Sequence, residues 1–259
     1  LPTLADWGRV LDWRVVQMAQ LANVEVITGR RLTRADVLEY GADTVVIATG
    51  SRWRDDGVQP EGRDPVVGVE LPGVLTPEQV AAGARPPAGP VAVYDCEGYL
   101  VGSGVAELLA EDGFEVHLVT PFPVVSPVSD HTLEGEHLRR HLHRRGVVAH
   151  RGISLGGFDT RSVWGEDDLG QAWRLPATGL VLVTQQTSDD QLFHEVSADP
   201  EALRAAGVTG LHRVGDSVAP RMTSEAVFDA HRLARELDSD DPSVPLPFLR
   251  ERVDLPPQT

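Results

Sequence analysis

The spacing of apolar side chains along the chain alternates between a helical period and a strand period. Between residues 4 and 22, apolar residues recur every three or four positions, which is the period of an amphipathic helix. Periodicity and capping residues predict further helices at residues 33–40, 77–82, 101–112, 133–145 and 220–237. Thr33 is the expected N-cap of the second helix, and Gly41 is expected to end it.

Short apolar runs between these helices predict a series of strands. We expect strands at residues 24–27, 44–49, 91–94, 116–119, 147–150, 161–164, 180–184 and 207–214, the run at 161–164 belonging to a hairpin-like insert. The strand at 44–49 is expected to be buried. Residues 52–90 are expected to form an ordered connector, and residues 238–259 a tail on the surface. This alternation predicts an α/β fold with largely parallel sheets.

Charge and composition exclude several classes of function. The chain has 259 residues, with 39 acidic and 23 basic side chains and a net charge of −16, which argues against binding nucleic acid or anionic lipid. Every basic residue except histidine is arginine, so no lysine is present for Schiff-base chemistry. Cys96 is the only cysteine, which excludes an intrachain disulfide or a cysteine-ligated cluster and suggests a cytoplasmic setting. No apolar run approaches the ~20 residues of a membrane span.

The strand–helix–strand unit at residues 91–119 lacks the glycines that a dinucleotide requires. The three fingerprint positions after its first strand are Asp95, Glu97 and Leu100. Glycines at these positions let the backbone approach a pyrophosphate at the helix N-terminus. Two carboxylates there would repel phosphate, so the sequence predicts that this unit does not bind NAD(P).

Two weaker signals lie on either side of this unit. A predicted strand ends in Ala48, Thr49 and Gly50, and a later one ends in Gly215 and Asp216. In this order they resemble flavoproteins with two dinucleotide domains, in which both segments belong to one adenine-nucleotide domain and the late aspartate accepts hydrogen bonds from the nucleotide's sugar portion. The alternative for Asp216 is a helix N-cap.

Five segments make the resemblance specific, and together they span most of the chain. They are residues 45–53 (VVIATGSRW), 75–80 (LTPEQV), 91–110 with the altered turn, 215–221 (GDSVAPR) and 230–236 (AHRLARE). In this order and at these spacings they resemble the C-terminal region of the trimethylamine, dimethylamine and histamine dehydrogenase family.

The resemblance implies an α/β fold with two Rossmann-like three-layer nucleotide-binding domains, one inserted in the other, as in glutathione reductase but with the N-terminal part missing. It implies a partial FAD- or ADP-binding domain at residues 1–85 and 187–239, an inserted NAD(P)-binding-like domain at 86–186, and a tail at 240–259. The cofactor-binding residues it implies are Ala48, Thr49, Gly50, Gly215 and Asp216, with ADP or FAD as the ligand. Catalytic and metal-binding residues are not expected within the chain.

The remaining family features are implied for the rest of a longer protein. The chain begins at Leu1 without an initiator methionine, so we expect a segment upstream. The family places FMN and a 4Fe-4S cluster in an N-terminal TIM barrel, here expected in the same chain or in a separate subunit. It implies oxidative N-demethylation or deamination of small amines, an electron-transfer flavoprotein as acceptor and a homo-oligomer when complete.

Two alternatives stay open at this point. One is a non-catalytic scaffold or interaction subunit whose nucleotide pocket is empty. The other is an NAD(P)H-dependent flavin or enoate reductase, against which the missing fingerprint glycines argue.

Overall fold

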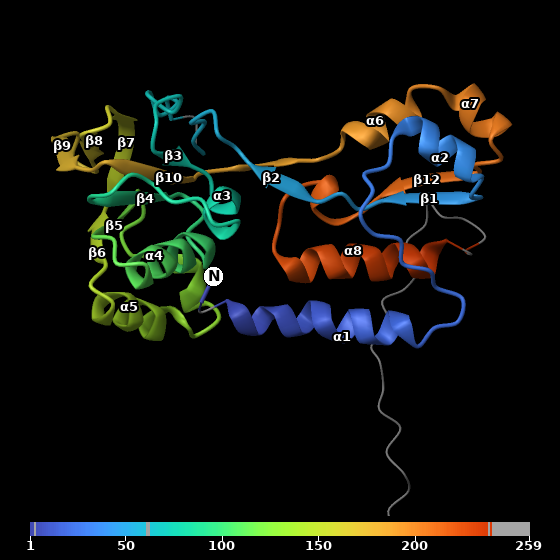
Figure 1. Ribbon diagram of the computed structural model, residues 1–259, viewed down its shortest axis with the longest axis horizontal. Coiled ribbons are helices and arrows are strands. Elements are labelled where there is room, and N and C mark those ends of the chain that lie inside the picture. The colour runs from blue at the N-terminus through green and yellow to red at the C-terminus, as the bar shows by residue number, and fades with distance from the viewer. Residues whose placement is uncertain (3, 61–62, 238, 240–259) are drawn as a thin grey trace, which may run out of the picture. The chain divides into compact units, whose positions relative to one another are not determined.

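The computed structural model describes residues 1–2, 4–60, 63–237 and 239, and the chain divides into two compact units (Figure 1). Unit 1 comprises Leu1–Arg30 and Arg52–Thr187, and unit 2 comprises Arg31–Ser51 and Ser188–Thr259. Most of unit 1 is therefore inserted in sequence between the two segments of unit 2. Residues 1–30 and 52–85, which the sequence assigned to the partial FAD- or ADP-binding domain, group in the structure with the segment 86–186. The predicted tail at 240–259 lies outside the described residues.

A five-stranded parallel sheet forms the centre of unit 1. Its strands lie in the order β3 (Val74–Leu75), β10 (Gly179–Val183), β4 (Val91–Asp95), β5 (Val116–Thr120) and β6 (Val148–Arg151). All residues of β4, β5 and β10 are buried, as expected of a parallel sheet covered on both faces. The order β6-β5-β4-β10 is that of one half of a dinucleotide-binding fold. The predicted α/β fold with a parallel sheet is confirmed.

Alternate residues of β4 face two different layers. Val91 and Val93 pack in a cluster with apolar residues of the helices α3 (Pro77–Ala81), α4 (Val101–Glu111) and α5 (Gly135–Arg144). Ala92 and Tyr94 pack in a second cluster with the antiparallel strands β7 (Ile153–Phe158), β8 (Ser162–Asp167) and β9 (Ala172–Pro176). Unit 1 therefore has three layers, with helices on one face of the central sheet and a small second sheet on the other. The hairpin-like insert is confirmed, although its strands β7 and β9 were not predicted.

Tyr94 supplies a polar contact within this buried second cluster. Its hydroxyl donates to Oε1 of Gln59 at 2.6 Å and accepts from the backbone N–H of Leu155 at 3.2 Å. Burial raises the pKa of Tyr94 above its usual value, so the hydroxyl stays protonated and available as a donor.

The N-terminal segment of unit 1 forms the expected helix but not the expected strand. A 3₁₀ turn (η1, Ala5–Trp7) leads into α1 (Gly8–Ala19). The strand predicted at residues 24–27 is wrong, because these residues adopt no regular structure. Val26 and Ile27 are 60% and 68% exposed. A strand needs a neighbour for its backbone hydrogen bonds, and no strand of the described residues pairs with this segment.

Unit 2 is built on two parallel strands with helices on both faces. β1 (Thr44–Ile47) pairs with β12 (Gly210–Arg213) in register. Figure 1 shows α2 (Arg34–Tyr40), α6 (Gln191–Ser197) and α7 (Pro200–Ala205) on one face and α8 (Thr223–Glu236) on the other. Thr33 and Asp36 form a capping box at α2, and Gly41 ends it with φ +71°, as the sequence predicts.

Three expectations for unit 2 need correction. The strand at 44–49 ends at Ile47 and is not buried, since Val46 is 41% exposed on a sheet of only two strands. The last helix begins at Thr223 rather than at Pro220. The helices α6 and α7 were not predicted, because each is only one to two turns long.

Two further short strands, β2 (Ser51–Trp53) and β11 (Gln186–Ser188), pair with each other where the chain passes between the units. The described residues also include the 3₁₀ turns η2 (Pro127–Asp130) and η3 (Gly215–Ser217). Among them, no helix has the length and apolar character that crossing a bilayer requires.

Candidate functional site

The carboxyl ends of β1 and β12 bring the two predicted strand-end segments together. Ile47 and Arg213, the last residues of the two strands, are register partners. The carbonyl oxygen of Ile47 accepts hydrogen bonds from the backbone N–H of Val214 at 3.0 Å and from the hydroxyl of Ser217 at 3.1 Å. Residues 48–51 and 215–217 therefore leave the sheet at the same edge. In open parallel sheets, ligands bind outside this carboxyl edge.

Both predicted glycines have backbone conformations that disfavour other residues. Gly50 has φ +79°, and a Cβ built on it would meet no heavy atom within 4 Å. Gly215 has φ +65°, is buried, and would place a Cβ 3.2 Å from that of Ala226. Gly50 therefore presents bare backbone beside open space, whereas Gly215 permits close packing of the turn against α8.

Asp216 is held at the centre of the site by two contacts. Its Oδ2 accepts from the hydroxyl of Ser51 at 3.2 Å, and its Oδ1 accepts from the backbone N–H of Arg221 at 3.2 Å. Asp216 is not the N-cap of α8, because Met222 occupies that position. Each carboxylate oxygen has two lone pairs, so both retain capacity to accept a further hydrogen bond.

Thr49 and Ala48 have different surroundings from Asp216. The hydroxyl of Thr49 donates to the carbonyl oxygen of Asp189, and the N–H of Asp189 donates to the carbonyl oxygen of Gly50 at 2.9 Å. These bonds fix the path of the turn and commit the Thr49 hydroxyl as a donor. Ala48 is exposed. Its side chain offers only an apolar surface.

Sequence reasoning missed a charged cluster beside these turns. Nη1 of Arg213 lies 2.7 Å from Oδ2 of Asp190, and its guanidinium lies over the ring of Phe193 at 4.9 Å from the centroid. Desolvation raises the pKa of Asp190, but His194, whose Nε2 lies 3.0 Å from the same carboxylate, and then Arg213 together hold this pKa below its usual value. The only sequence signal was the pair of aspartates just before a helix, which is typical of an N-terminus.

These residues fit one wall of a site for a nucleotide. Asp216 offers a carboxylate for sugar hydroxyls, and Gly50 offers backbone next to open space. In the dinucleotide-binding fold a glycine-rich turn with free N–H groups binds the phosphates, and the strand ends at 48–51 and 215–217 do not supply such a turn. The described part of unit 2 therefore offers acceptors for hydroxyl groups but no glycine-rich turn of the kind that binds phosphates in dinucleotide folds.

The corresponding turn in unit 1 has the opposite character. Asp95 is completely buried at the end of β4, and Glu97 follows it before α4. Desolvation raises the pKa of Asp95 to about 7, and the neighbouring Glu97 carboxylate adds to this. The expectation that two carboxyl groups occupy the fingerprint positions is therefore correct in geometry as well as in sequence.

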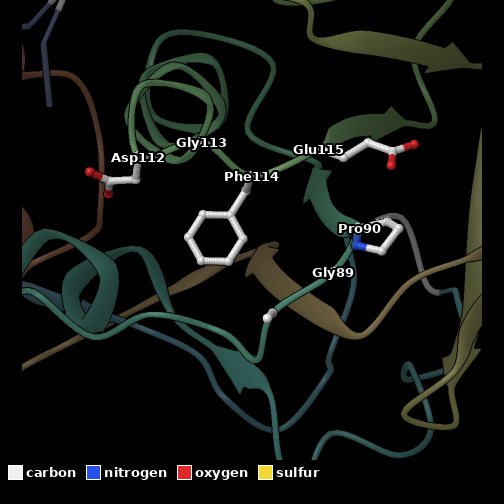
Figure 2. Close-up of a pocket in the computed structure, with 7 residues that line it drawn as sticks. Gly89, Pro90, Asp112, Gly113, Phe114 and Glu115 are labelled. Carbon is white, nitrogen blue, oxygen red and sulfur yellow. The ribbon is translucent and has the colours of Figure 1, made fainter.

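A separate recess lies at the other end of β4. It has a volume of about 250 Å³ and is lined by residues 88–90 and 112–115. Figure 2 shows the ring of Phe114 between Asp112 and the loop that carries Gly89. This recess adjoins the amino end of β4, which begins at Val91, whereas parallel sheets bind ligands at their carboxyl edge. We assign it no role.

Comparison with known proteins identifies the relatives of the chain. No protein-family model matches it. Dimethylamine dehydrogenase of Hyphomicrobium sp. (strain x) is 32% identical over 97% of the chain. The solved structure of histamine dehydrogenase from Rhizobium sp. 4-9 superposes on 99% of the chain with a TM-score of 0.90 and 35% identity. The chain is homologous to dimethylamine dehydrogenase and histamine dehydrogenase over nearly its whole length.

A third relative shares the same architecture. The structure of 6-hydroxypseudooxynicotine amine oxidase from Pseudomonas geniculata N1 matches 92% of the chain with a TM-score of 0.88 and 33% identity. The chain covers 38%, 38% and 35% of these three proteins, in the order given. The predicted resemblance to amine dehydrogenases is therefore confirmed for this part of their length.

Proposed function

We propose that the chain is the C-terminal nucleotide-binding portion of an amine dehydrogenase-type oxidoreductase. The observation that carries this proposal is the match to histamine dehydrogenase over 99% of the chain. In the complete protein, FMN, a 4Fe-4S cluster and the amine-oxidising residues lie in a TIM barrel outside this chain, in the same polypeptide or in a separate subunit. That protein oxidises a small amine by N-demethylation or deamination and passes electrons to an electron-transfer flavoprotein.

The role of this chain within the proposal is to bind ADP or FAD without contributing a catalytic residue. Thr49 and Gly50 shape one side of the site, and Gly215 and Asp216 shape the other. The free acceptor capacity of Asp216 and the open space beside Gly50 support this assignment. In this proposal, the glycine-rich turn that binds the phosphates belongs to a part of the longer protein outside this chain.

The first experiment measures the intact mass and the ultraviolet–visible spectrum of the protein purified from its native source. A mass well above 28.0 kDa, with flavin and iron–sulfur absorbance, is the expected result if the barrel is in the same polypeptide. If the barrel is a separate subunit, a chain of 28.0 kDa co-purifies with a coloured partner. A colourless protein of 28.0 kDa that purifies alone would contradict the proposal and favour a scaffold subunit.

The second experiment tests the nucleotide site in the protein that contains the missing segment. Asp216→Asn removes the charge but keeps the shape, and the loss of a charge-assisted hydrogen bond is expected to weaken ADP binding about 10-fold or more in calorimetry. Glu39→Gln, an exposed change on α2 of the same unit, is the matched control and should leave the affinity unchanged. Equal affinities of wild type and Asp216→Asn would refute the assigned role of Asp216.

The same preparation separates this proposal from the reductase alternative. An NAD(P)H-dependent flavin reductase would bleach its own flavin when NADPH is added under anaerobic conditions. We expect no such reduction by NADPH, because Asp95 and Glu97 occupy the positions that a dinucleotide needs. Rapid bleaching by NADPH would favour the reductase.

A further inference from the structure

A recess larger than the one at the amino end of β4 lies beside the strand β6 in unit 1. β6 is at one end of the five-stranded sheet, and β5 is its only partner among the described strands. The recess has a volume of about 510 Å³, and residues of β6, of α5 and of the segment 124–125 after β5 line it. This volume is within the range of sites that bind small molecules in proteins. We call it the β6 recess.

The floor of the β6 recess is apolar because the helical layer covers β5 but leaves part of β6 open. Leu118 of β5 and Ala149 of β6 are register partners, and both line the recess. Leu118 is completely buried, whereas Ala149 is exposed. Leu142 of α5 and Val147 also line the recess, and both belong to the apolar cluster beneath the helices. An apolar group bound here would cover this surface, which is favourable in water.

The described residues that line the β6 recess include three basic side chains and no acidic one. The basic residues are Arg139, His143 and Arg151. Arg139 is held in place, because its Nη1 donates to the carbonyl oxygen of Val125 at 3.0 Å and its Nη2 donates to Oδ1 of Asp130 at 2.7 Å. Asp130 therefore compensates the charge of Arg139. This wall carries positive charge on a chain whose net charge is −16.

Arg151 is the basic residue that remains available for a ligand. It is the last residue of β6, it is exposed, and its side chain forms no hydrogen bond or ion pair with another described residue. It follows Ala149 by two positions, so the two side chains share one face of the strand. A guanidinium presents paired N–H donors that match the two oxygens of a carboxylate. An uncompensated cation thus borders an apolar recess.

We propose that the β6 recess binds a small organic carboxylate with an apolar body. The carboxylate pairs with the guanidinium of Arg151, and the apolar body covers Leu118, Leu142 and Ala149. A single negative charge fits better than a phosphate ester, because a chain with a net charge of −16 repels each further negative charge. The inference does not depend on the proposed oxidoreductase function, since all of these residues lie in unit 1 and outside the candidate nucleotide site.

The experiment measures the binding of sodium octanoate to the complete protein by isothermal titration calorimetry, near neutral pH and at low ionic strength. We expect a Kd of about 1 mM or lower. Acetate has the carboxylate without the apolar body, and protonated octylamine has the body with the opposite charge. Each of these two should bind at least about 10-fold more weakly than octanoate.

Three variants locate the binding. Arg151→Gln removes the charge-assisted pair and should weaken octanoate binding about 10-fold or more. Arg144→Gln is the matched control, because it removes the same charge from an exposed position on α5 that does not line the recess, and it should leave the Kd unchanged. Ala149→Leu fills the floor of the recess without a change of charge, and it should also weaken binding about 10-fold or more.

Four results would overturn the proposal. The first is the absence of octanoate binding at about 10 mM, which would mean that the recess is closed or filled in the complete protein. The second is binding of acetate or octylamine as tight as that of octanoate. The third is wild-type affinity in Arg151→Gln or in Ala149→Leu, and the fourth is an equal loss in Arg144→Gln. If Arg151→Gln does not fold, Ala149→Leu and the three ligands still decide the question.

Discussion

Replacing Asp95 with asparagine is expected to remove a pH dependence of stability that the wild-type protein has. Asp95 is fully buried, and burial, followed by repulsion from Glu97, raises its pKa from 3.8 to about 7. The unfolded chain therefore loses this proton near pH 4, whereas the folded chain holds it to about pH 7. The stabilisation is complete below the unfolded pKa, declines as the pH rises, and is lost above the folded pKa.

The size of the effect follows from the difference between these two pKa values. One pKa unit corresponds to about 1.4 kcal/mol, so the whole decline is on the order of 4 kcal/mol. The isoelectric point is about 4.9, and protein solubility is poor near it. Urea unfolding from about pH 5.5 to pH 8.5 avoids this region and still captures about 2 kcal/mol of the decline.

The assay compares the free energy of unfolding of wild type and Asp95→Asn across this range. Asparagine keeps the acceptor for the N–H groups of Glu97 and Gly98, so the turn is preserved. We expect the variant to gain about 2 kcal/mol relative to wild type as the pH rises. Asp12→Asn, an exposed change on α1, should follow the wild-type curve. If Asp95→Asn also runs parallel to wild type, the folded protein does not hold the proton and the reasoning is refuted.

Two further predictions concern the packing of unit 1, and thermal unfolding monitored by circular dichroism tests both. Tyr94→Phe removes a buried hydroxyl that makes two hydrogen bonds, so it should lower the free energy of unfolding by about 1–3 kcal/mol. The control Tyr40→Phe changes a side chain that is 73% exposed and should leave the free energy of unfolding unchanged. An equal Tm for the two variants would contradict this. Gly102→Ala places a Cβ 2.4 Å from Cγ of Asp95 and should lower stability by about 1–3 kcal/mol. Gly8→Ala, a helical glycine with open space around it, should be neutral or stabilising, and equal losses in the two alanine variants would count against the steric argument.

Local sequence signals predicted the central strands β4, β5 and β10 of unit 1 because each of them pairs with neighbouring strands in a covered sheet. The apolar runs of β4, β5 and β10 lie in one sheet that is covered on both faces, so pattern and environment agree. The strands β7 and β9 were missed for a related reason. They belong to a small antiparallel sheet that packs only one face on the core, and glycines and charged residues interrupt their pattern.

The candidate site could be predicted only in part, because several of its contacts join residues that are far apart in the sequence. The strand ends at Gly50 and Asp216 carried a sequence signal, and the register of β1 with β12 brings them to one edge. The contacts of Arg213 and Asp190 depend on where the loop before α6 runs, which no local pattern reveals. The turn at Asp95 and Glu97 was easier to predict, because the absence of glycines can be read from the sequence. The hydrogen bond that Glu97 accepts from the N–H of Val101 in α4 could not be predicted in this way.

The failed strand at residues 24–27 and the exposed β1 have a common physical cause. A strand is stable when its backbone groups pair and its side chains are covered, and two parallel strands provide little of either. β1 has β12 as its single partner among the described strands, and Val46 is left 41% exposed. The apolar residues at 24–27 keep a strand-like composition but have no described partner strand. Pairing of the backbone and covering of the side chains, rather than strand-like composition, therefore decide which of these apolar runs forms a buried strand.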